Sequence, residues 1–520
     1  MSQKDRILKV SKNFKRGVGK LTCLNNEVDP NEPFNLSNEM NEQVTGSGFF
    51  IRHSSIYLPR ECAHHKYCLT NAHVVEGSST KRITISFPHL GDTILWGEVI
   101  LACRALDFAV IEVRAENNVH LEKELGQTFS EVFKSIPFIK MCSDPVNTNQ
   151  ELAKDVLAIG YPLDSNDAHI STGCISGKHE HYLQINGSIN SGNSGGPLFD
   201  ANGICIGINA ASFEESEGIT LAIEFHHITK MLQYYWNGKD LVIYPPSLGI
   251  RTKKLIDAYA QTKLKDENIK GVLVSDVHEE NCFRNKVKKG DIILSIGDQR
   301  WEFDIDRSGN VSLPFQHQKV QFYCLNVLLL LDPNTCFVRV YSKIKRKTIS
   351  FILKTLLDTV KHVMPSIEPI PCFSCGGVIF TQLTKNHMEE VPEDIDPNVI
   401  NFFTNTHGSK KAVVISSYHI PCSLIEQGYN LRKLTIVKSI NKKKICTIER
   451  CKELFMKILE AHKRDPDNKR FKFVELETEN ETLIMDVSLA FKIEMLLQLT
   501  PSFKQQYSLV NNLKRKISEV

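Results

Sequence analysis

The sequence predicts an all-β domain of the barrel type followed by two small α+β domains, and three observations lead to this prediction. Residues 44–235 form short β-branched runs separated by turn residues, which is typical of a β-barrel or sandwich. Pro245 and Pro246 then interrupt the pattern, and a boundary is expected there because proline fixes φ and removes a donor. The rest of the chain contains one order of elements twice.

Length and composition agree with three folded domains. The chain has 520 residues, and domains average roughly 150 residues. Hydrophobic residues make up 42% and charged residues 24%, which is ordinary for globular domains. The 63 Lys and Arg nearly balance the 60 Asp and Glu, so composition predicts no nucleic-acid or membrane partner. The longest apolar stretch, around Val327 to Leu331, is too short for a transmembrane segment.

Residues 1–43 are predicted to be a basic N-terminal arm. The first 20 residues are rich in Lys and Arg and lack the apolar core of a secretory signal. A short organellar presequence is the alternative, which Asp5 and the shortage of Ser and Ala disfavour. The fifteen cysteines are scattered and odd in number, so the expected location is an intracellular reducing compartment, the cytoplasm or nucleus.

The strongest local motif is Gly192-Asn193-Ser194-Gly195-Gly196, which lies between two strand-like segments. Flanking glycines allow the backbone to turn sharply and present the Ser194 hydroxyl. The same turn would direct the amides of Gly192 and Ser194 at one point, where an oxyanion could develop. A plain turn between two strands is the alternative.

A serine nucleophile needs a base and a carboxylate that orients the base. His73 ends an apolar strand in LTNAHVV and is the candidate base; a structural histidine is the alternative. Asp107 opens the alternating strand DFAVIEV and is the candidate carboxylate, with a turn-forming Asp as the alternative. The chain order His73, Asp107, Ser194 is that of proteases built from two β-barrels, which joins the three motifs into one catalytic hypothesis.

The segments TNAHVV, DFAVIEV and SINSGNSGGPLFDANGICIGIN resemble the HtrA/Deg family of trypsin-fold serine proteases. The resemblance covers residues 44–235 and implies a trypsin-like double β-barrel protease domain, here residues 44–240, followed by two PDZ-like domains. It assigns His73 as general base and acid, Asp107 as its orienting partner and Ser194 as nucleophile, with Gly192, Asn193 and Ser194 supplying the oxyanion loop. It also implies ATP-independent cleavage of unfolded or partly folded polypeptides, without a cofactor, by a homo-oligomer.

The resemblance leaves substrate preference open, and the sequence suggests one. The strand Ile206–Ala210 would line the specificity pocket, and its side chains are apolar or small with no acid among them. We therefore expect small or medium aliphatic side chains at the P1 position of a substrate.

The internal repeat gives the two C-terminal domains, residues 245–360 and 365–520, the second with a helical extension. The segment from Asn334 overlays the segment from Asn468 at an offset of 134, and both resemble a β-hairpin. Each follows a predicted amphipathic helix, VQFYCLNVLLLL or CKELFMKILEAH, and a pair of strand-like blocks. The second copy is similar to the divergent second PDZ domain of the eukaryotic Deg branch.

Leu248-Gly249-Ile250 resembles the carboxylate-binding loop of this family, where a peptide C-terminus adds as an edge strand. A glycine turn that opens a strand is the alternative. The second copy lacks such a loop, so it could be a docking surface instead.

Two other readings compete with the protease. A catalytically idle barrel would make the chain a peptide-binding scaffold or chaperone. The Cys62, His64, His65 and Cys68 cluster has ligand-type residues, but a zinc site would need four tetrahedral donors from one short loop, and no metal site is predicted.

Overall fold

The structure is a computed structural model. It describes residues 14–26, 41–52, 58, 65–142, 144–162, 165–187, 192–212, 218–256, 269–278, 281–284, 286–316, 318–342, 345–355, 361–365, 367–368, 370–388, 399, 414–419, 434–445, 447–478 and 481–497. The chain divides into two compact units. The first comprises residues 1–25 and 42–356, and the second comprises residues 26–41 and 357–520.

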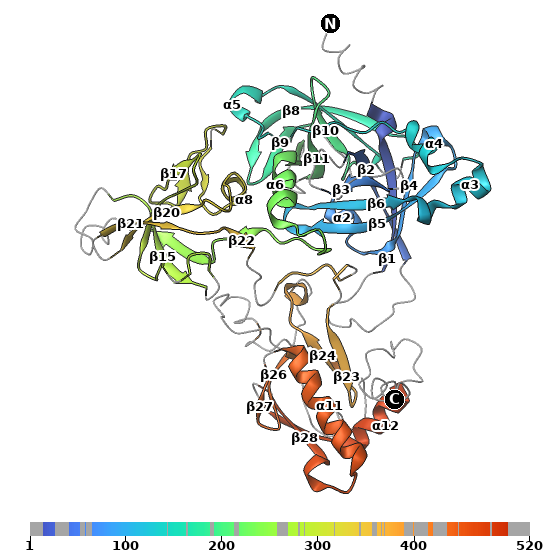
Figure 1. The fold of residues 1–520 in the computed structure, drawn as a ribbon, viewed down its shortest axis with the longest axis vertical. Helices are drawn as coiled ribbons and strands as arrows, with labels where there is room; N and C mark the ends of the chain where they lie inside the picture. Colours follow the sequence, from blue (N-terminus) through green and yellow to red (C-terminus); the bar gives the residue numbers. More distant parts are fainter. Residues whose placement is uncertain are drawn as a thin grey trace. The chain divides into compact units, whose positions relative to one another are not determined.

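The first unit begins with two closed antiparallel barrels (Figure 1). Barrel 1 has the strand order β1-β2-β3-β6-β5-β4. Its strands are β1 (Val18–Asn26), β2 (Asn41–Ile51), β3 (His65–Thr70), β4 (Ser78–Ser86), β5 (Ile94–Cys103) and β6 (Phe108–Arg114). Barrel 2 has the order β10-β11-β12-β9-β8-β7. Its strands are β7 (Asp155–Gly160), β8 (His169–His179), β9 (Tyr182–Asn186), β10 (Pro197–Asp200), β11 (Cys205–Ser212) and β12 (Ile219–Glu224). The predicted all-β double barrel is confirmed.

Short helices join the strands, and one longer helix follows the second barrel. The α-helices are α2 (Ala72–Val75), α3 (His120–Leu125), α4 (Phe129–Lys134), α5 (Thr148–Glu151) and α6 (Phe225–Tyr235). The 3-10 helices are η1 (Lys15–Gly17), η3 (Pro88–Leu90), η4 (Arg104–Leu106) and η5 (Ala115–Asn118). Helix α6 packs its apolar side into the core of the barrels through Phe225, Ile228, Met231 and Leu232.

The predicted basic arm is wrong over part of its length. Strand β1 lies within residues 1–43, and it closes barrel 1 by pairing with β4. Val18, Leu21 and Cys23 are fully buried, because an all-antiparallel barrel buries one face of every strand. The buried residues of β1 form only a short apolar pattern in the sequence, and the lysine-rich residues in front of the strand make that pattern hard to recognise. Residues 1–13 lie outside the described part of the chain.

The first C-terminal module forms a six-stranded sheet of order β14-β15-β16-β20-β21, with β17 paired to β16. Its strands are β14 (Ile250–Lys254), β15 (Val272–Val277), β16 (Ile292–Gly297), β17 (Glu302–Asp304), β20 (Phe337–Ser342) and β21 (Lys345–Ser350). Two small ladders complete it, β13 (Pro246–Ser247) with β22 (Lys354–Thr355), and β18 (Asn310–Val311) with β19 (Val320–Gln321).

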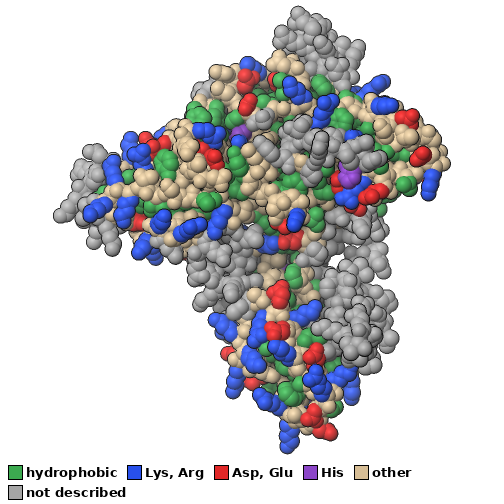
Figure 2. Space-filling view, viewed as in Figure 1, with side chains coloured by type: hydrophobic (Ala, Val, Ile, Leu, Met, Phe, Trp, Pro, Cys, Tyr) green, Lys and Arg blue, Asp and Glu red, His purple; other side chains and the backbone are tan. Residues whose placement is uncertain are grey.

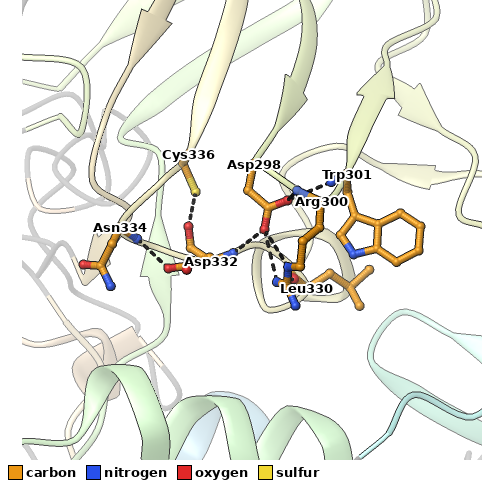
Figure 3. Close-up of polar contacts among 7 residues, drawn as sticks. All are labelled: Asp298, Arg300, Trp301, Leu330, Asp332, Asn334 and Cys336. Atoms are coloured by element: carbon orange, nitrogen blue, oxygen red, sulfur yellow. Dashed lines mark hydrogen bonds and ion pairs between the residues drawn. The ribbon is translucent and has the colours of Figure 1, made fainter.

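A buried carboxylate, Asp298, holds the loops of this module together (Figure 3). Its oxygens accept hydrogen bonds from the amides of Arg300, Trp301 and Asp332 at 2.8, 2.8 and 2.7 Å, and from the Arg300 guanidinium at 3.1 Å. Burial alone would raise the pKa of Asp298, but these donors favour the charged form, and the net effect lowers the pKa. The turn after β16 is thus fixed to the loop that precedes β20.

The amphipathic helix predicted for VQFYCLNVLLLL is largely absent. Only α8 (Leu325–Leu328) is helical, and the segment starts as strand β19. Leu328, Leu330 and Leu331 enter the core of the module, whereas Leu329 enters the core of the barrels. The apolar run is buried on several sides at once, so it forms no helix with a polar face.

The second module forms a seven-stranded sheet of order β23-β24-β25-β26-β28-β29, with β27 paired to β26. Its strands are β23 (Cys372–Cys375), β24 (Val378–Gln382), β25 (Val414–His419), β26 (Thr435–Ile440), β27 (Lys443–Lys444), β28 (Phe473–Thr478) and β29 (Thr482–Asp486). Its helices are α11 (Ile448–Arg464), α12 (Val487–Leu497) and the 3-10 helices η8 (Lys385–Met388) and η9 (Lys469–Phe471). The second predicted helix, CKELFMKILEAH, lies within α11.

The repeat is real in element order, but its offset is 136 residues rather than 134. The inward side chains of β20, Val338 and Val340, correspond to Val474 and Leu476 of β28. A shift by two residues keeps the same face of a strand inward, so the sequence overlay could not detect the error.

No helix among the described residues is long and apolar enough to span a membrane.

Candidate active site

The register of β3 and β6 brings His73 and Asp107 together. In this antiparallel pair Thr70 lies opposite Ala109, so the chain leaving β3 and the chain entering β6 meet at the same end of the barrel. His73 Nδ1 lies 2.8 Å from Asp107 Oδ2, and the His73 amide donates to Asp107 Oδ1 at 3.0 Å. The carboxylate thus fixes both the ring and the backbone of His73.

Asp107 occupies a left-handed backbone conformation with φ 49°, which is uncommon for a residue other than glycine. Two hydrogen bonds hold it there. Its amide donates to the carbonyl of Arg104 at 3.1 Å, and the Asn71 side chain donates to its carbonyl at 2.8 Å. In this strained conformation the carboxylate contacts His73, and Asp107 does not continue the extended backbone of β6.

Several effects act on the pKa of His73. Burial lowers it, but the hydrogen bond to Asp107 and the negative charges of Asp107 and Glu76 raise it, and the net effect raises the pKa above the ordinary value of a histidine. The His73 side chain is 45% exposed and that of Asp107 18%. A ring open to solvent on one side and paired with a carboxylate on the other is suited to exchanging a proton with a bound reactant.

Ser194 lies in the turn before β10, and its loop is anchored to barrel 1. The Ser47 amide on β2 donates to the Ser194 carbonyl at 2.8 Å, and the Ser47 hydroxyl donates to the Gly192 carbonyl at 2.6 Å. The same hydroxyl accepts from the Tyr161 amide at 2.9 Å. Ser47 thus joins both sides of the serine loop to the barrel that carries His73 and Asp107.

The Ser194 hydroxyl donates to the carbonyl of Ala210 on β11 at 2.6 Å. The structure gives it no hydrogen bond to His73, so two of the three predicted residues are bonded to each other and the third is held by a backbone carbonyl. The neighbouring carbonyls of β11 are also engaged, since the Gly195 amide donates to Asn209 at 2.9 Å.

The glycines around Ser194 are required by space and by conformation. Gly192 and Gly195 have φ 94° and 86°. A Cβ on Gly195 would lie 2.1 Å from the Ser47 carbonyl oxygen and 2.2 Å from Thr70 Oγ1. Among the described residues, the amides of Gly192, Asn193 and Ser194 have no hydrogen-bond acceptor, whereas those of Gly195 and Gly196 do. These three free amides belong to the predicted oxyanion loop.

Only part of the strand predicted to line a specificity pocket could contact a substrate. Ile206 and Ile208 on β11 are packed into the cores of the barrels, so that part of the prediction is wrong. Ala210 remains next to the Ser194 hydroxyl through its carbonyl. The structure does not describe the side chains of residues 211–217.

The other predicted sites have mixed outcomes. Gly249 has φ 69°, Leu248 is buried, and Ile250 begins β14, which is the first strand in its sheet order. The Gly249 amide donates to Ser247 Oγ at 3.2 Å, so a peptide carboxylate would have to replace that bond.

Of the proposed zinc cluster, Cys62 and His64 lie outside the described residues. His65 Nδ1 lies 2.8 Å from Glu112 Oε1, and Cys68 is fully buried, which raises the pKa of its thiol and disfavours the thiolate that binds a metal. The described residues contain no group of three or more potential metal ligands.

Sequence reasoning missed Ser47 and Asn71, and it named Ala210 only as the end of the strand predicted to line the specificity pocket. A signal for Ser47 exists, because it stands between Gly46 and Gly48 at the start of an apolar strand. A Cβ on Gly46 would lie 2.7 Å from Val74, so the glycine allows β2 to approach the His73 segment. The Asn71 side chain donates to the carbonyl of Asp107, and the Ala210 carbonyl accepts from the Ser194 hydroxyl; both contacts join distant segments and leave no local pattern in the sequence.

Residues 46–208 match the trypsin-like peptidase domain family. The chain is 28% identical over 277 residues to a protein named "Putative serine protease HhoB" from Synechocystis, which covers 49% of this chain and 57% of that protein. It is 24% identical over 394 residues to "Protease Do-like 2, chloroplastic" from Arabidopsis thaliana, covering 73% of this chain and 58% of that protein. The chain therefore spans less than two thirds of the length of these relatives.

Among solved structures, the chain is similar to one titled "HtrA-type protease AlgW with decapeptide". The match has a TM-score of 0.45 and 19% identity, and covers 68% of this chain and 99% of the other.

Proposed function

Because the chain carries a trypsin-like peptidase domain and is homologous to HtrA/Deg serine proteases, we propose that it is an ATP-independent serine endopeptidase that cleaves unfolded or partly folded polypeptides. One observation carries the proposal. The His73–Asp107 pair and the Ser194 loop are fixed to the same barrel, and the loop retains free amides next to its serine.

In the proposed reaction, Ser194 Oγ attacks the scissile carbonyl carbon and His73 Nε2 takes the hydroxyl proton. Asp107 holds Nδ1 in its protonated form and stabilises the imidazolium that results. The amides of Gly192 and Ser194 stabilise the oxyanion. His73 then protonates the leaving amine, and it activates the water that hydrolyses the acyl-enzyme.

The reaction requires the Ser194 hydroxyl to exchange its hydrogen bond. In the structure it donates to Ala210, and it must donate to His73 Nε2 before attack. A bound substrate strand that pairs with the Ala210 carbonyl would take this acceptor away from the serine. Substrate binding would then release the nucleophile.

Substrate preference is proposed to be for small or medium aliphatic P1 side chains. This preference is now supported by Ala210 alone and no longer by the whole strand Ile206–Ala210. Ala210 lies beside the Ser194 hydroxyl, and its side chain is small. Cleavage of a peptide library checks this, and a dominant Arg or Lys at P1 would contradict it.

The first module is proposed to bind peptide C-termini along β14. That strand is the first in its sheet order, and Gly249 supplies a left-handed turn in front of it. A homo-oligomer and a reducing intracellular location are also proposed, and the second is supported by the twelve described cysteines, none of which is in a disulfide.

Active-site labelling tests the catalytic proposal. A fluorophosphonate probe should form an adduct with the full chain, and the Ser194→Ala variant should give none. A catalytically idle scaffold would give no Ser194-dependent adduct, and it would still bind unfolded polypeptide.

A further inference from the structure

The second module contains a groove that the proposed protease activity does not use. It has a volume of about 770 Å³. It lies between the end of β26, one side of α11, η9 and the β28–β29 hairpin. Its lining residues are Ile440, Asn441, Lys442, Lys443, Leu454, Lys457, Ile458, Lys469, Arg470, Phe471, Phe473, Glu475 and Ile484, and we call it the basic groove. Its volume is in the range of sites that bind peptides or small ligands.

The floor of the basic groove is apolar and mostly aliphatic. Ile440 and Leu454 are buried, and Ile458 is partly buried. Phe473 and Ile484 are 46% and 51% exposed, on the outer face of the β28–β29 hairpin. Large apolar side chains exposed inside a concave site indicate that a partner covers them.

The rim of the basic groove is positively charged. Among the described residues, Lys442, Lys443, Lys469 and Arg470 form no ion pair, whereas Lys457 pairs with Glu453 at 2.5 Å. Glu475 is the only acid in the lining. Unpaired cations around a depression concentrate positive potential there, which favours an anionic occupant. Figure 2 shows that Lys and Arg side chains are frequent on the surface of this unit.

The backbone gives independent support. Asn441 and Lys442 form the turn between β26 and β27 with φ 46° and 63°, the conformation of a hairpin turn that normally has Asn followed by Gly. Lysine stands in the glycine position, where a side chain is strained. The sequence therefore carries a strained residue at the one turn position that brings a cation to the groove.

Two classes of anionic polymer could occupy such a site, and the floor distinguishes them. Single-stranded nucleic acid would need aromatic rings free for base stacking. The ring of Phe471 has Arg470 at 6.0 Å from its centre, and the ring of Phe473 has Lys472 at 5.5 Å, so a cation of the chain already occupies one face of each ring. The aliphatic floor instead suits the side chain of a peptide.

We propose that the basic groove binds an acidic peptide segment, which places an aliphatic or aromatic side chain on the floor and Asp or Glu side chains on the cationic rim. The occupant is a polypeptide partner that the second module holds by an internal segment. This requires no free C-terminus and no glycine-flanked carboxylate loop, which the module lacks.

The test measures binding to the full chain in its Ser194→Ala form, so that no outcome depends on proteolysis. The probe is a fluorescent synthetic peptide of alternating Asp or Glu and Leu with one Phe, and fluorescence anisotropy gives Kd at several salt concentrations. Binding should weaken with salt, and a peptide with Lys in place of each acid should not bind.

The variants were chosen so that the fold survives. Lys442→Gly relieves the strained turn, and Lys443→Gln and Ile484→Thr change exposed strand positions. The rim double variant Lys442→Gly/Lys443→Gln should weaken binding by about tenfold or more, and Ile484→Thr should weaken it without changing the salt dependence. Lys444→Gln is the matched control for the Lys443→Gln change alone, because Lys444 is next to Lys443 on β27, does not line the groove, and the substitution likewise removes one charge.

Three results would overturn the proposal. The rim variants could bind the peptide as tightly as the parent chain does. An oligo-dT strand could bind more tightly than the peptide with the same dependence on Lys442 and Lys443, which would indicate a nucleic-acid site. Vesicles of anionic phospholipid could show that dependence while the peptide does not bind.

Discussion

At the scale of single residues, the site depends on a few hydrogen bonds between segments that are far apart in the chain. His73 and Asp107 are bonded to each other, and Ser47 holds the Ser194 loop from the opposite barrel. The motifs of His73, Asp107 and Ser194 could be recognised in the sequence because each is short and has informative neighbours, and of the contacts expected among them the structure contains the His73–Asp107 hydrogen bond. Flanking glycines mark Ser47 in the sequence, but its role could not be predicted, because that role depends on a loop about 145 residues away.

Ser47→Ala should lower kcat and leave KM nearly unchanged. The variant removes the donor to the Gly192 carbonyl and the acceptor of the Tyr161 amide, and each buried group left unpaired costs about 1–3 kcal/mol. If half of the cost of both groups falls on the geometry of the serine loop, kcat falls by about fivefold to 150-fold. Steady-state cleavage of a peptide substrate measures this. Ser135→Ala removes a local hydrogen bond from a serine hydroxyl to a carbonyl at the end of α4 and should have no effect on kcat.

The pH dependence of activity should follow His73. The base must be neutral, and the pKa of His73 is raised above its ordinary value, so kcat/KM should fall as the pH decreases through that raised pKa. Asp107→Asn removes the hydrogen bond and the charge of Asp107, which raise the pKa of His73, and leaves the charge of Glu76, so the acidic limb should move to lower pH while kcat falls by about 10⁴. An acidic limb that stays in place in Asp107→Asn would contradict this assignment.

The same pair has a stability consequence of defined sign. A histidine whose pKa is raised in the folded state stabilises the fold fully below its unfolded pKa, and this contribution is lost as the pH rises through the folded pKa. The difference in stability between the parent chain and Asp107→Asn should therefore be larger at acidic pH. Thermal denaturation across that range measures the difference.

At the scale of elements, tight turns decide where side chains of the site lie. The turn before β10 depends on left-handed glycines, and Asp107 takes a left-handed conformation just before β6. Turn chemistry is local, so the sequence predicted the serine turn correctly. The predictions for the segments of strand β1 and helix α8 were wrong because long-range packing decides their structure. Strand β1 closes a barrel, and α8 divides its leucines between two cores.

Gly195→Ala should abolish activity and destabilise the protease domain. The new Cβ would meet the Ser47 carbonyl and Thr70 Oγ1 at about 2 Å, in addition to the backbone strain of about 1–2 kcal/mol at a left-handed position. Gly238→Ala is the matched control, with φ 78° and no atom within 4 Å of the added Cβ, so only the strain remains. Denaturation midpoints and fluorophosphonate labelling of both variants give the comparison. Equal losses in the two variants would show that crowding against Ser47 is unimportant.

At the scale of the whole molecule, the first module is part of the same compact unit as the barrels. Lys178 on β8 is buried with Glu224 at 2.7 Å, and its ammonium lies 5.1 Å from the centre of the Phe315 ring in the module. Asn326 of α8 also donates to the Glu180 carbonyl at the β8–β9 turn. The second module forms a separate unit, and each module has its own core.

Lys178→Met should destabilise the first unit by about 3–5 kcal/mol, because it leaves Glu224 charged and buried without its partner. Lys154→Met removes the same side chain from an exposed pair with Glu151 and should change stability by about 0.5 kcal/mol or less. Urea denaturation of both variants, followed by tryptophan fluorescence, measures the difference. If Lys178→Met is as stable as the parent chain, the buried pair is not a structural requirement.

The two hydrogen bonds that Ser47 donates to the Ser194 loop make the chemistry of Ser194 depend on the contact between the two barrels. Separation of the barrels by a few ångströms would break the hold on Gly192 and Ser194 while leaving both sheets closed and nearly all secondary structure intact. On heating, labelling of Ser194 should therefore disappear before circular dichroism reports any unfolding. The proposed protease would therefore lose its activity at a lower temperature than its secondary structure.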